Sequence, residues 1–311
     1  SSAAQVLRQK LVASDAQQGD QFGVSVSISG DWAVVGANQD DDLGSQAGAA
    51  YMFMRSGTQW IETQKLTASD GGTFDTFGGA VAICGDVVVV GAISDYALNV
   101  YDSGSAYIFE RVGTTWMETA KIWASNLNQQ EHFGWSVAAT TNRVIIGARD
   151  SISTGVNAGA AYIFDNNAGT WTQTATLTAI GALYGDSFGG AVAIDGDVAV
   201  VGASSVDVVG TNAGAAYFFQ NFGGVWSQVA RVTASDGLAG EFFGTSVSIQ
   251  ANRALVGTTG HDHGISNSGA AYVFEDGGSG WAETQELRAL DPEGQDLFGV
   301  KVCCGDLATV A

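Results

Sequence analysis

An acidic residue stands two positions before each of six Phe-Gly pairs, at Asp20, Asp75, Glu131, Asp186, Glu241 and Asp296. In four units another acid stands five residues earlier. The resulting pairs are Asp15 with Asp20, Asp70 with Asp75, Asp236 with Glu241, and Asp291 with Asp296. Two carboxylates that bracket a short loop could bind Ca²⁺, with backbone carbonyls and water completing the shell. Because Asp and Asn side chains also cap backbone N–H groups in turns, a structural role is the alternative.

Two further groups of side chains break the repeat and could bind ligands. The first combines Asp40, Asp41 and Asp42 with Tyr96, Tyr101 and Asp102, an acidic and aromatic set that suits sugar hydroxyls or an ion. The second is the run from His261 to His263, which offers two imidazoles and a carboxylate. Transition-metal sites need a third or fourth protein ligand, and the neighbouring sequence supplies none. We therefore expect this run to be an exposed polar loop.

Enzyme motifs are absent from the sequence. It has no G-x-S-x-G, H-E-x-x-H or P-loop pattern, and its 3 histidines leave little general-base chemistry near neutral pH. Carboxylate pairs could serve a glycosidase, but a chain with 32 acids contains such pairs by chance. The sequence predicts a protein that is not an enzyme, and a glycosidase is a remote alternative.

The elements that position these acids recur at intervals of 55 or 56 residues, as the Phe-Gly pairs show. Their phenylalanines are Phe22, Phe77, Phe133, Phe188, Phe243 and Phe298. In the first unit, residues 24–28 alternate between apolar and polar types, residues 32–37 form a continuous apolar run, and residues 47–54 and 60–68 complete four strand patterns. No helical pattern intervenes. Four antiparallel strands in each repeat predict an all-β fold, a β-propeller.

Two aromatic columns accompany the strands. A tyrosine recurs in the third strand and a tryptophan opens the fourth; the columns are Tyr51, Tyr107, Tyr162, Tyr217 and Tyr272, and Trp60, Trp116, Trp171, Trp226 and Trp281. Aromatic residues at one place in every blade indicate packing between neighbouring sheets.

The pattern F-G-x-S-V-x-I-x-G-D-x-x-V-V-G-A at 22–37, 77–92 and 188–203, followed by G-A-A-Y and W-x-E-T-x-K-L, resembles FG-GAP repeats. These are the propeller units of integrin α-subunits and of many secreted microbial proteins. The resemblance covers essentially the whole chain and implies a propeller that acts outside the cell or at its surface in adhesion, ligand binding or assembly. Integrin-type repeats often carry a D-x-D-x-D-G calcium loop between the first two strands. This chain has only short turns there, so the family calcium sites are not carried over.

A net charge of −20 is the second strong signal. In a meander, the loops between strands two and three and the loops leading to the next blade emerge on one face, which we call the long-loop face. Most acids fall in these loops, and Arg149 is the single base. This charge excludes nucleic acid as a partner and favours a cation or a basic partner. No run of 18 apolar residues exists, so no membrane span is expected.

Residues 1–311 read as a single domain whose units begin near 22, 77, 133, 188, 243 and 298. Five units are whole. Residues 5–13 match a fourth strand and are expected to close a composite sixth blade from both chain ends; a longer natural chain could form seven blades. That composite blade lacks its third strand, and an exposed sheet edge pairs readily with another chain.

The sequence therefore predicts an extracellular structural or adhesion module. It would bind protein subunits, surface glycans or cations through the long-loop face, and could form a homo-oligomer or filament. No cofactor is certain, and Ca²⁺ is the candidate ion. A lectin-like propeller is the main alternative.

Overall fold

The computed structural model describes residues 9–153, 157–262, 264, 266–304 and 309–310. These residues form five four-stranded antiparallel sheets, each with its strands in sequence order. The first three blades comprise β1 (Ser25–Ser29), β2 (Trp32–Ala37), β3 (Ala49–Ser56) and β4 (Gln59–Leu66); β5 (Phe77–Cys84), β6 (Val87–Ala92), β7 (Ser105–Val112) and β8 (Thr115–Ile122); and β9 (Ser136–Ala139), β10 (Arg143–Ala148), β11 (Ala160–Asn167) and β12 (Thr170–Leu177).

The remaining sheets follow the same plan. They comprise β13 (Phe188–Asp195), β14 (Val198–Ala203), β15 (Ala215–Phe222) and β16 (Val225–Val232); then β17 (Ser246–Gln250), β18 (Arg253–Thr258), β19 (Ala270–Asp276) and β20 (Trp281–Leu287). The sixth unit contributes the short pair β21 (Val302–Cys303) and β22 (Thr309–Val310). Within the described residues, η1 (Ala97–Asn99) is the one helical turn, and no helix is long and apolar enough to cross a membrane.

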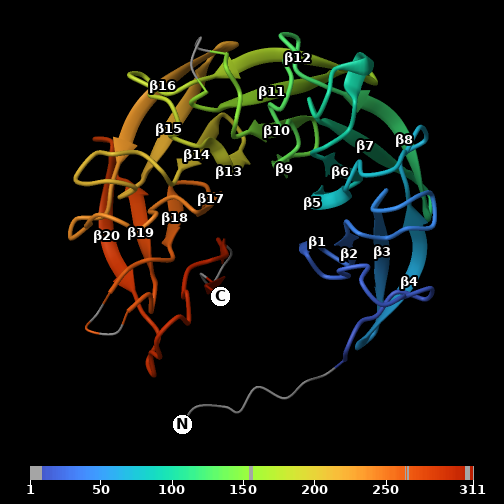
Figure 1. Ribbon diagram of the computed structural model, residues 1–311, viewed down its shortest axis with the longest axis horizontal. Helices are drawn as coiled ribbons and strands as arrows, with labels where there is room; N and C mark the ends of the chain where they lie inside the picture. Colours follow the sequence, from blue (N-terminus) through green and yellow to red (C-terminus); the bar gives the residue numbers. More distant parts are fainter. Residues whose placement is uncertain (1–8, 154–156, 263, 265, 305–308, 311) are drawn as a thin grey trace.

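The five sheets surround a central axis, with the first strand of each nearest the centre and the fourth at the rim (Figure 1). The all-β propeller fold with about six blades is thus confirmed, and five blades are complete in the described part of the chain. The predicted second strand has the same bounds as β2, while the other strands of the first unit differ from prediction by one or two residues at their ends. Register is decided by pairing with neighbours, which a single strand pattern does not reveal.

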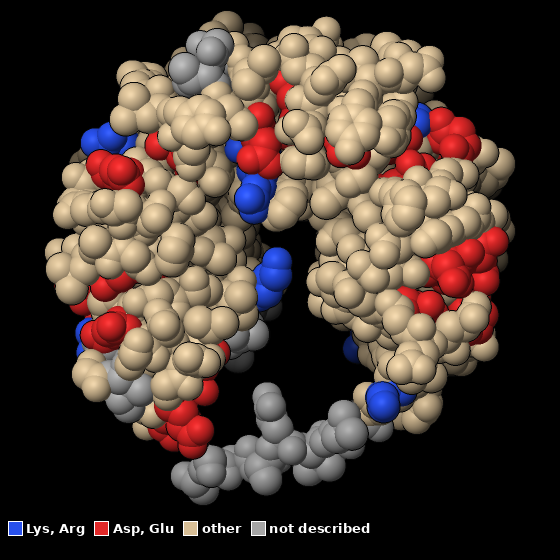
Figure 2. All heavy atoms as spheres, in the orientation of Figure 1, with Lys and Arg blue, Asp and Glu red and all other residues tan. Residues whose placement is uncertain are grey.

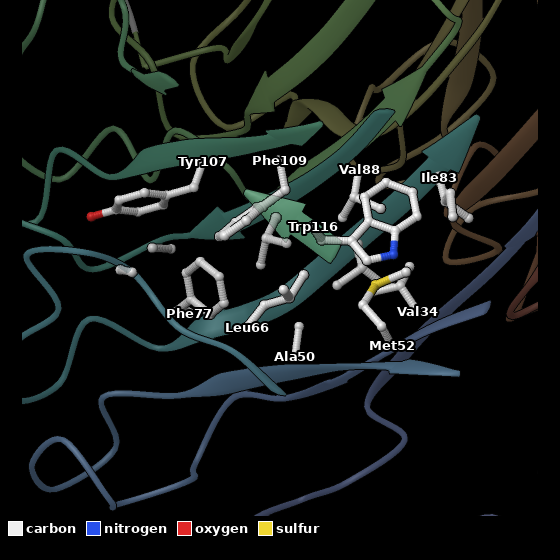
Figure 3. Close-up of a cluster of buried hydrophobic side chains, with 14 of the residues drawn as sticks. Val34, Ala50, Met52, Leu66, Phe77, Ile83, Val88, Tyr107, Phe109 and Trp116 are labelled. Carbon is white, nitrogen blue, oxygen red and sulfur yellow. The ribbon is translucent and has the colours of Figure 1, made fainter. Parts of the chain in front are cut away.

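Blades stack through apolar side chains that repeat with the sequence. Phe77 packs edge-on against Tyr107 and Phe109, with ring centroids 5.4 and 6.1 Å apart. Figure 3 shows these rings facing Val34, Met52 and Leu66 of the preceding blade in one buried cluster. Tyr51, Tyr107, Tyr162, Tyr217 and Tyr272 are all buried. The tyrosine column therefore packs between sheets, as predicted, and apolar burial of this kind is the main stabilising term.

The recurring glycines follow from the close approach of neighbouring blades. A β-bridge joins Gly48, just before β3, to Phe77 of the next blade. A Cβ atom on Gly48 would lie 2.0 Å from the Phe77 carbonyl oxygen, and one on Gly36 would lie 2.0 Å from that of Gly78. Any other residue would clash with the backbone of the next blade, so both motifs recur in register.

The rim carries a second repeated contact. The Gln64 side chain donates to the Trp116 carbonyl at 2.7 Å and accepts from the Trp116 N–H at 2.8 Å. Gln9 makes the same pair of hydrogen bonds with Trp60, at 2.8 and 2.7 Å. Residue 9 thus lies beside blade 1 where a preceding fourth strand would lie, although residues 9–13 form no strand ladder. Residues 5–8 of the expected outer strand lie outside the described residues, so closure of a composite blade stays a prediction.

Candidate cation sites on the long-loop face

In each blade, five residue positions come together at the end of the sheet that carries the long loops. We call this group the pocket of that blade. In blade 1 they are Asp15, Asp20, Asp40, Tyr51 and Lys65. Two come from the loop entering the blade, one from the start of the β2–β3 loop, one from β3 and one from β4. Antiparallel order places both loops at the same end of the sheet as these ends of β3 and β4.

In blade 1 an ammonium group fills the pocket. Lys65 Nζ lies 2.8 Å from Asp15 Oδ2, 2.8 Å from Asp40 Oδ2 and 2.6 Å from Asp42 Oδ2. The Tyr51 hydroxyl lies 2.8 Å from Asp15 Oδ1 and 2.7 Å from Asp40 Oδ2. Burial would lower the pKa of Lys65, but its hydrogen bonds to Asp15, Asp40 and Asp42 raise that pKa well above its ordinary value. The pocket therefore holds a permanent cation of its own.

Blade 2 repeats this arrangement. Lys121 Nζ lies 2.7 Å from Asp70 and 2.8 Å from Asp95, and Tyr107 donates to Asp70 at 2.8 Å. Burial opposes ionisation of Asp70, but hydrogen bonds from Lys121 and Tyr107 hold its pKa below the ordinary value. Burial instead raises the pKa of Asp75. The pKa values of the two acids in one predicted calcium pair thus shift in opposite directions.

The acid that precedes the Phe-Gly pair caps the turn entering the blade in most units, whereas Glu241 of blade 5 contacts His261. Four of these carboxylates accept the N–H three residues earlier, in the contacts Gln17 to Asp20 at 2.6 Å, Gly72 to Asp75 at 2.5 Å, Leu183 to Asp186 at 2.7 Å and Glu293 to Asp296 at 2.6 Å. This is the capping geometry that the sequence offered as the alternative to calcium. Asp291 is exposed at the surface of the sixth unit. Calcium binding by these pairs stays a prediction.

Among the described residues, the pockets of blades 3 and 4 contain no ion pair of this kind, although Arg231 of blade 4 takes the position of Lys65. In blade 3 the Tyr162 hydroxyl lies 3.1 Å from Ser151 Oγ and 2.8 Å from Ser153 Oγ, and Ser151 donates to Glu131. In blade 4 the corresponding loop position is the buried Val206. The same fold therefore accommodates different side chains at the equivalent pocket positions of different blades.

Blade 5 inverts the charges of blade 1. His261 takes the position of Asp40, and Glu286 that of Lys65. His261 is only 3% exposed; its Nδ1 lies 2.9 Å from Glu241 Oε1, and its Nε2 lies 3.6 Å from both Asp236 Oδ2 and Glu286 Oε1. Tyr272 donates to Asp236 at 2.7 Å. Burial opposes ionisation of Asp236, yet the Tyr272 bond and the nearby charge of His261 hold its pKa below the ordinary value.

The expectation of an exposed polar loop at 261–263 is therefore wrong for His261. Its partners are distant in sequence, which is why inspection of neighbouring residues found no third ligand. Glu286 was missed as well, although its replacement of the lysine in W-x-E-T-x-K-L was visible in the sequence. Asp262 is exposed and accepts the Asn267 N–H. His263 lies outside the described residues.

The residues predicted to form one glycan or ion pocket separate into two groups. Asp40 and Asp42 surround Lys65. Tyr96 and Tyr101 contact each other edge-on, with centroids 5.3 Å apart. Asp102 lies beside Tyr101 and raises the pKa of its hydroxyl through a hydrogen bond. Asp41 is exposed, and no hydrogen bond, ion pair or ring contact between described residues joins 40–42 to 96–102.

The long-loop acids are also less exposed than their loop positions suggested. Asp40, Asp95 and Glu241 are buried, and Lys65 and Lys121 reach this end of the sheet from β4 and β8. On the face seen in Figure 2, acidic side chains form separate patches around the ring.

Comparisons with known proteins agree with this architecture. No curated protein matches the chain. Among solved structures, it is similar to a functionally unknown protein from Desulfotomaculum acetoxidans DSM 771, with a TM-score of 0.55 and 10% identity over 90% of this chain and 75% of that one. At this identity the likeness shows the fold alone. The family model of the FG-GAP repeat matches residues 6–53, 60–109, 116–164, 171–219 and 226–274. The chain therefore belongs to the FG-GAP repeat family.

Proposed function

We propose that this protein is a non-enzymatic extracellular structural module that associates with other protein subunits, including copies of itself. The observation that carries the proposal is an uncovered apolar face on β1. Val26 and Ile28 are 68% and 62% exposed, whereas the equivalent Val81 and Ile83 of blade 2 are 8% and 6% exposed. The equivalent residues are also buried in blades 4 and 5, and Val137 and Ala139 of blade 3 are partly buried against the preceding blade. Location outside the cell rests on what is typical of the family.

Within the described residues, the sixth unit lies beside blade 5 and does not cover the exposed side of β1. The Cys304 N–H donates to Ser248 Oγ at 2.9 Å, which ties the sixth unit to β17. In Figure 1 the ring is open between the C-terminal strands and β1. A second copy that packs its own sheet against β1 would cover this face and extend the array head to tail. An exposed β-branched strand face of this kind favours association.

Light scattering and electron microscopy of the purified chain test the self-association. We expect oligomers or filaments that Val26→Asp converts to monomers, because a charge on the packed face is costly to bury. Val112→Asp is the matched control, since Val112 is 67% exposed at the C-terminal end of β7. It should leave the assembly unchanged. A wild-type chain that stays monomeric at about 100 μM, a concentration where contacts of roughly 5 kcal/mol would be populated, would refute this part of the proposal.

The long-loop face supplies the surface for other partners. Leu43, Tyr96 and Leu98 are 50%, 47% and 66% exposed among acidic loops. Apolar side chains interspersed with carboxylates suit a partner that presents basic and apolar groups together. Exchange of Leu98 for Asp should abolish capture of such a partner without affecting assembly through β1.

Glycan binding is the second candidate function, and the exposed pair Tyr96 and Tyr101 favours it. Each ring is 47% exposed, and the two are fixed against one another. Exposed tyrosine faces beside a carboxylate suit sugar rings and hydroxyls. A glycan array probed with wild type and with the Tyr101→Ala variant separates this function from protein association, because Tyr101 is not among the apolar residues offered to a protein partner and only the glycan signal should depend on it.

A further inference from the structure

We propose that the pocket of blade 5 binds one divalent transition-metal ion of the zinc class through Asp236 Oδ2, His261 Nε2 and Glu286 Oε1. This site is independent of the proposed association function, and it differs from the calcium prediction in both ligands and ion. The three ligand atoms lie within 4.8 Å of one another. They come from the loop entering the blade, the β18–β19 loop and β20.

The first argument is the way in which His261 is held. The ring is buried, and its Nδ1 lies 2.9 Å from the buried carboxylate of Glu241. A carboxylate on one ring nitrogen fixes the tautomer and directs the other nitrogen toward a metal, an arrangement found in most histidine metal sites. Here the other nitrogen, Nε2, faces the two remaining carboxylates at 3.6 Å. Glu241 is thus a positioning residue.

The second argument comes from the equivalent pocket of blade 1. There a cation lies between the two positions that Asp236 and His261 occupy in blade 5: Lys65 Nζ is 2.8 Å from both Asp15 and Asp40. In blade 5 the lysine is replaced by Glu286, so the cation is exchanged for a third ligand. The fold therefore brings a cation to this position in blade 1. In blade 5 the equivalent position is surrounded by three side chains that can bind a metal ion, and among the described residues no lysine ammonium group fills it.

The donor set selects the ion. One imidazole and two carboxylates suit Zn²⁺ or a related first-row ion, whereas Ca²⁺ prefers six to eight oxygen ligands. The Asp236 side chain is 44% exposed, so the site opens to solvent and water can complete a tetrahedral shell. Arg288 donates to Glu286 from the exposed side and lies 3.9 Å from Asp236. Its Nε donates to Oε1 and its Nη2 to Oε2, so a metal ion at Oε1 would use the second lone pair of that oxygen or displace the Nε contact, while the Nη2 contact to Oε2 remains.

Calorimetric titration of the chelator-treated full chain with Zn²⁺ tests the site. Wild type should bind one ion per chain with a Kd of about 10 μM or lower. Glu286→Lys should weaken binding more than about 100-fold while restoring the residue type of blades 1 and 2, so the fold should persist. Glu241→Gln should weaken binding about 10- to 100-fold, the range typical of outer-shell partners. Glu283→Gln, on the same strand but bonded to Ser235, is the matched control and should bind like wild type.

Co²⁺ absorption identifies the ligands. We expect the bands of a nitrogen and oxygen site, with no thiolate charge transfer, and loss of these bands in Glu286→Lys. Failure of wild type to bind one Zn²⁺, unchanged binding by Glu286→Lys, or a thiolate band removed by Cys303→Ser with Cys304→Ser would each overturn the assignment. Assembly through β1 is measured separately, so its failure would not be mistaken for failure of this site.

Discussion

The pockets of blades 1 and 5 are built on the same backbone and carry opposite charges at equivalent positions. In blade 1, Lys65 is surrounded by Asp15, Asp40 and Asp42, so the carboxylates are neutralised from within. In blade 5, His261 lies among Asp236, Glu241 and Glu286, and the exposed Arg288 approaches only from outside. The comparison shows that the buried tyrosine belongs to the fold, whereas the fourth-strand residue, Lys65 or Glu286, sets the charge of the pocket.

The largest expected effect is loss of the internal cation in blade 1. Lys65→Met keeps the length of the side chain but leaves Asp40, which is 4% exposed, without its countercharge. We expect the free energy of unfolding to fall by about 3 kcal/mol, because removing one partner strands a buried charge. Urea denaturation measures the change.

Two controls accompany Lys65→Met. Adding Asp40→Asn should restore part of the lost stability, since the stranded charge is then removed. Arg55→Met breaks the pair with Asp31 of the β1–β2 turn, where the side chains are 52% and 61% exposed, and should cost less than about 1 kcal/mol. Equal losses in Lys65→Met and Arg55→Met would show that the blade 1 cation has no special role.

Zn²⁺ should neutralise the carboxylates of the blade 5 pocket, as Lys65 does in blade 1. At a concentration 100 times its Kd, Zn²⁺ should stabilise the wild-type chain by about 2.7 kcal/mol. The double variant His261→Asp with Glu286→Lys recreates the donor types of blade 1, so its thermal midpoint should not respond to Zn²⁺. Differential scanning calorimetry measures both midpoints, and a full zinc response in the double variant would contradict the comparison.

The reciprocal substitution tests whether a pocket that holds a lysine can be converted into a metal site. Asp95→His with Lys121→Glu places the blade 5 residue types around Asp70 in blade 2. We expect a second Zn²⁺ per chain in calorimetric titration. It should bind more weakly than the first, because Asp75 is shorter than Glu241 and accepts the Gly72 N–H, whereas Glu241 holds a histidine. A stoichiometry that stays at one would show that residue types alone do not make the site.

A smaller effect is expected from the tyrosine hydroxyls. Tyr51→Phe removes a hydroxyl that contacts two carboxylates, and hydrogen bonds to charged groups contribute about 1.5–3 kcal/mol. Tyr162→Phe removes contacts with the neutral Ser151 and Ser153, where about 1 kcal/mol is expected. Parallel urea titrations compare them, and a larger loss in Tyr162→Phe would reverse the expected order.

The sequence predicted the scaffold well because each structural residue recurs. Phe77 repeats since it fills the space between two sheets, and Gly48 repeats since the next backbone passes within 2.0 Å of where its Cβ would lie. A contact that every blade needs requires a residue type that repeats at the blade interval, and such a repeat is visible in a single sequence. Capping by Asp20 and Asp75 was among the predicted alternatives for the same reason.

The pockets were harder to predict because their partners lie on different elements. Asp15, Asp40 and Lys65 are brought together only when β3 and β4 pair, and loop charge alone made the long-loop face look more negative than it is. His261 was expected at the surface, since nothing near it in sequence showed that Glu241 would enclose it. The replacement of lysine, as at Lys65, by Glu286 at the equivalent position was visible in the sequence, but its consequence for the pocket required the structure.

The smallest effect concerns the two acids of the blade 2 pair, whose pKa values shift in opposite directions. The pKa of Asp70 is lowered in the folded protein, so its contribution to stability exists above the ordinary value of 3.8 and is lost as pH falls through the folded value. The pKa of Asp75 is raised, so acidification relieves a cost instead. Asp70→Asn, which copies Asn126 of blade 3, should cost less than about 1 kcal/mol at pH 7, because the Asp70 side chain is 55% exposed. Between about pH 5 and pH 2 it should flatten the loss of stability, whereas Asp75→Asn should steepen it. Urea midpoints measured across this range decide the matter, and parallel curves for the two variants would show that the acids share one environment.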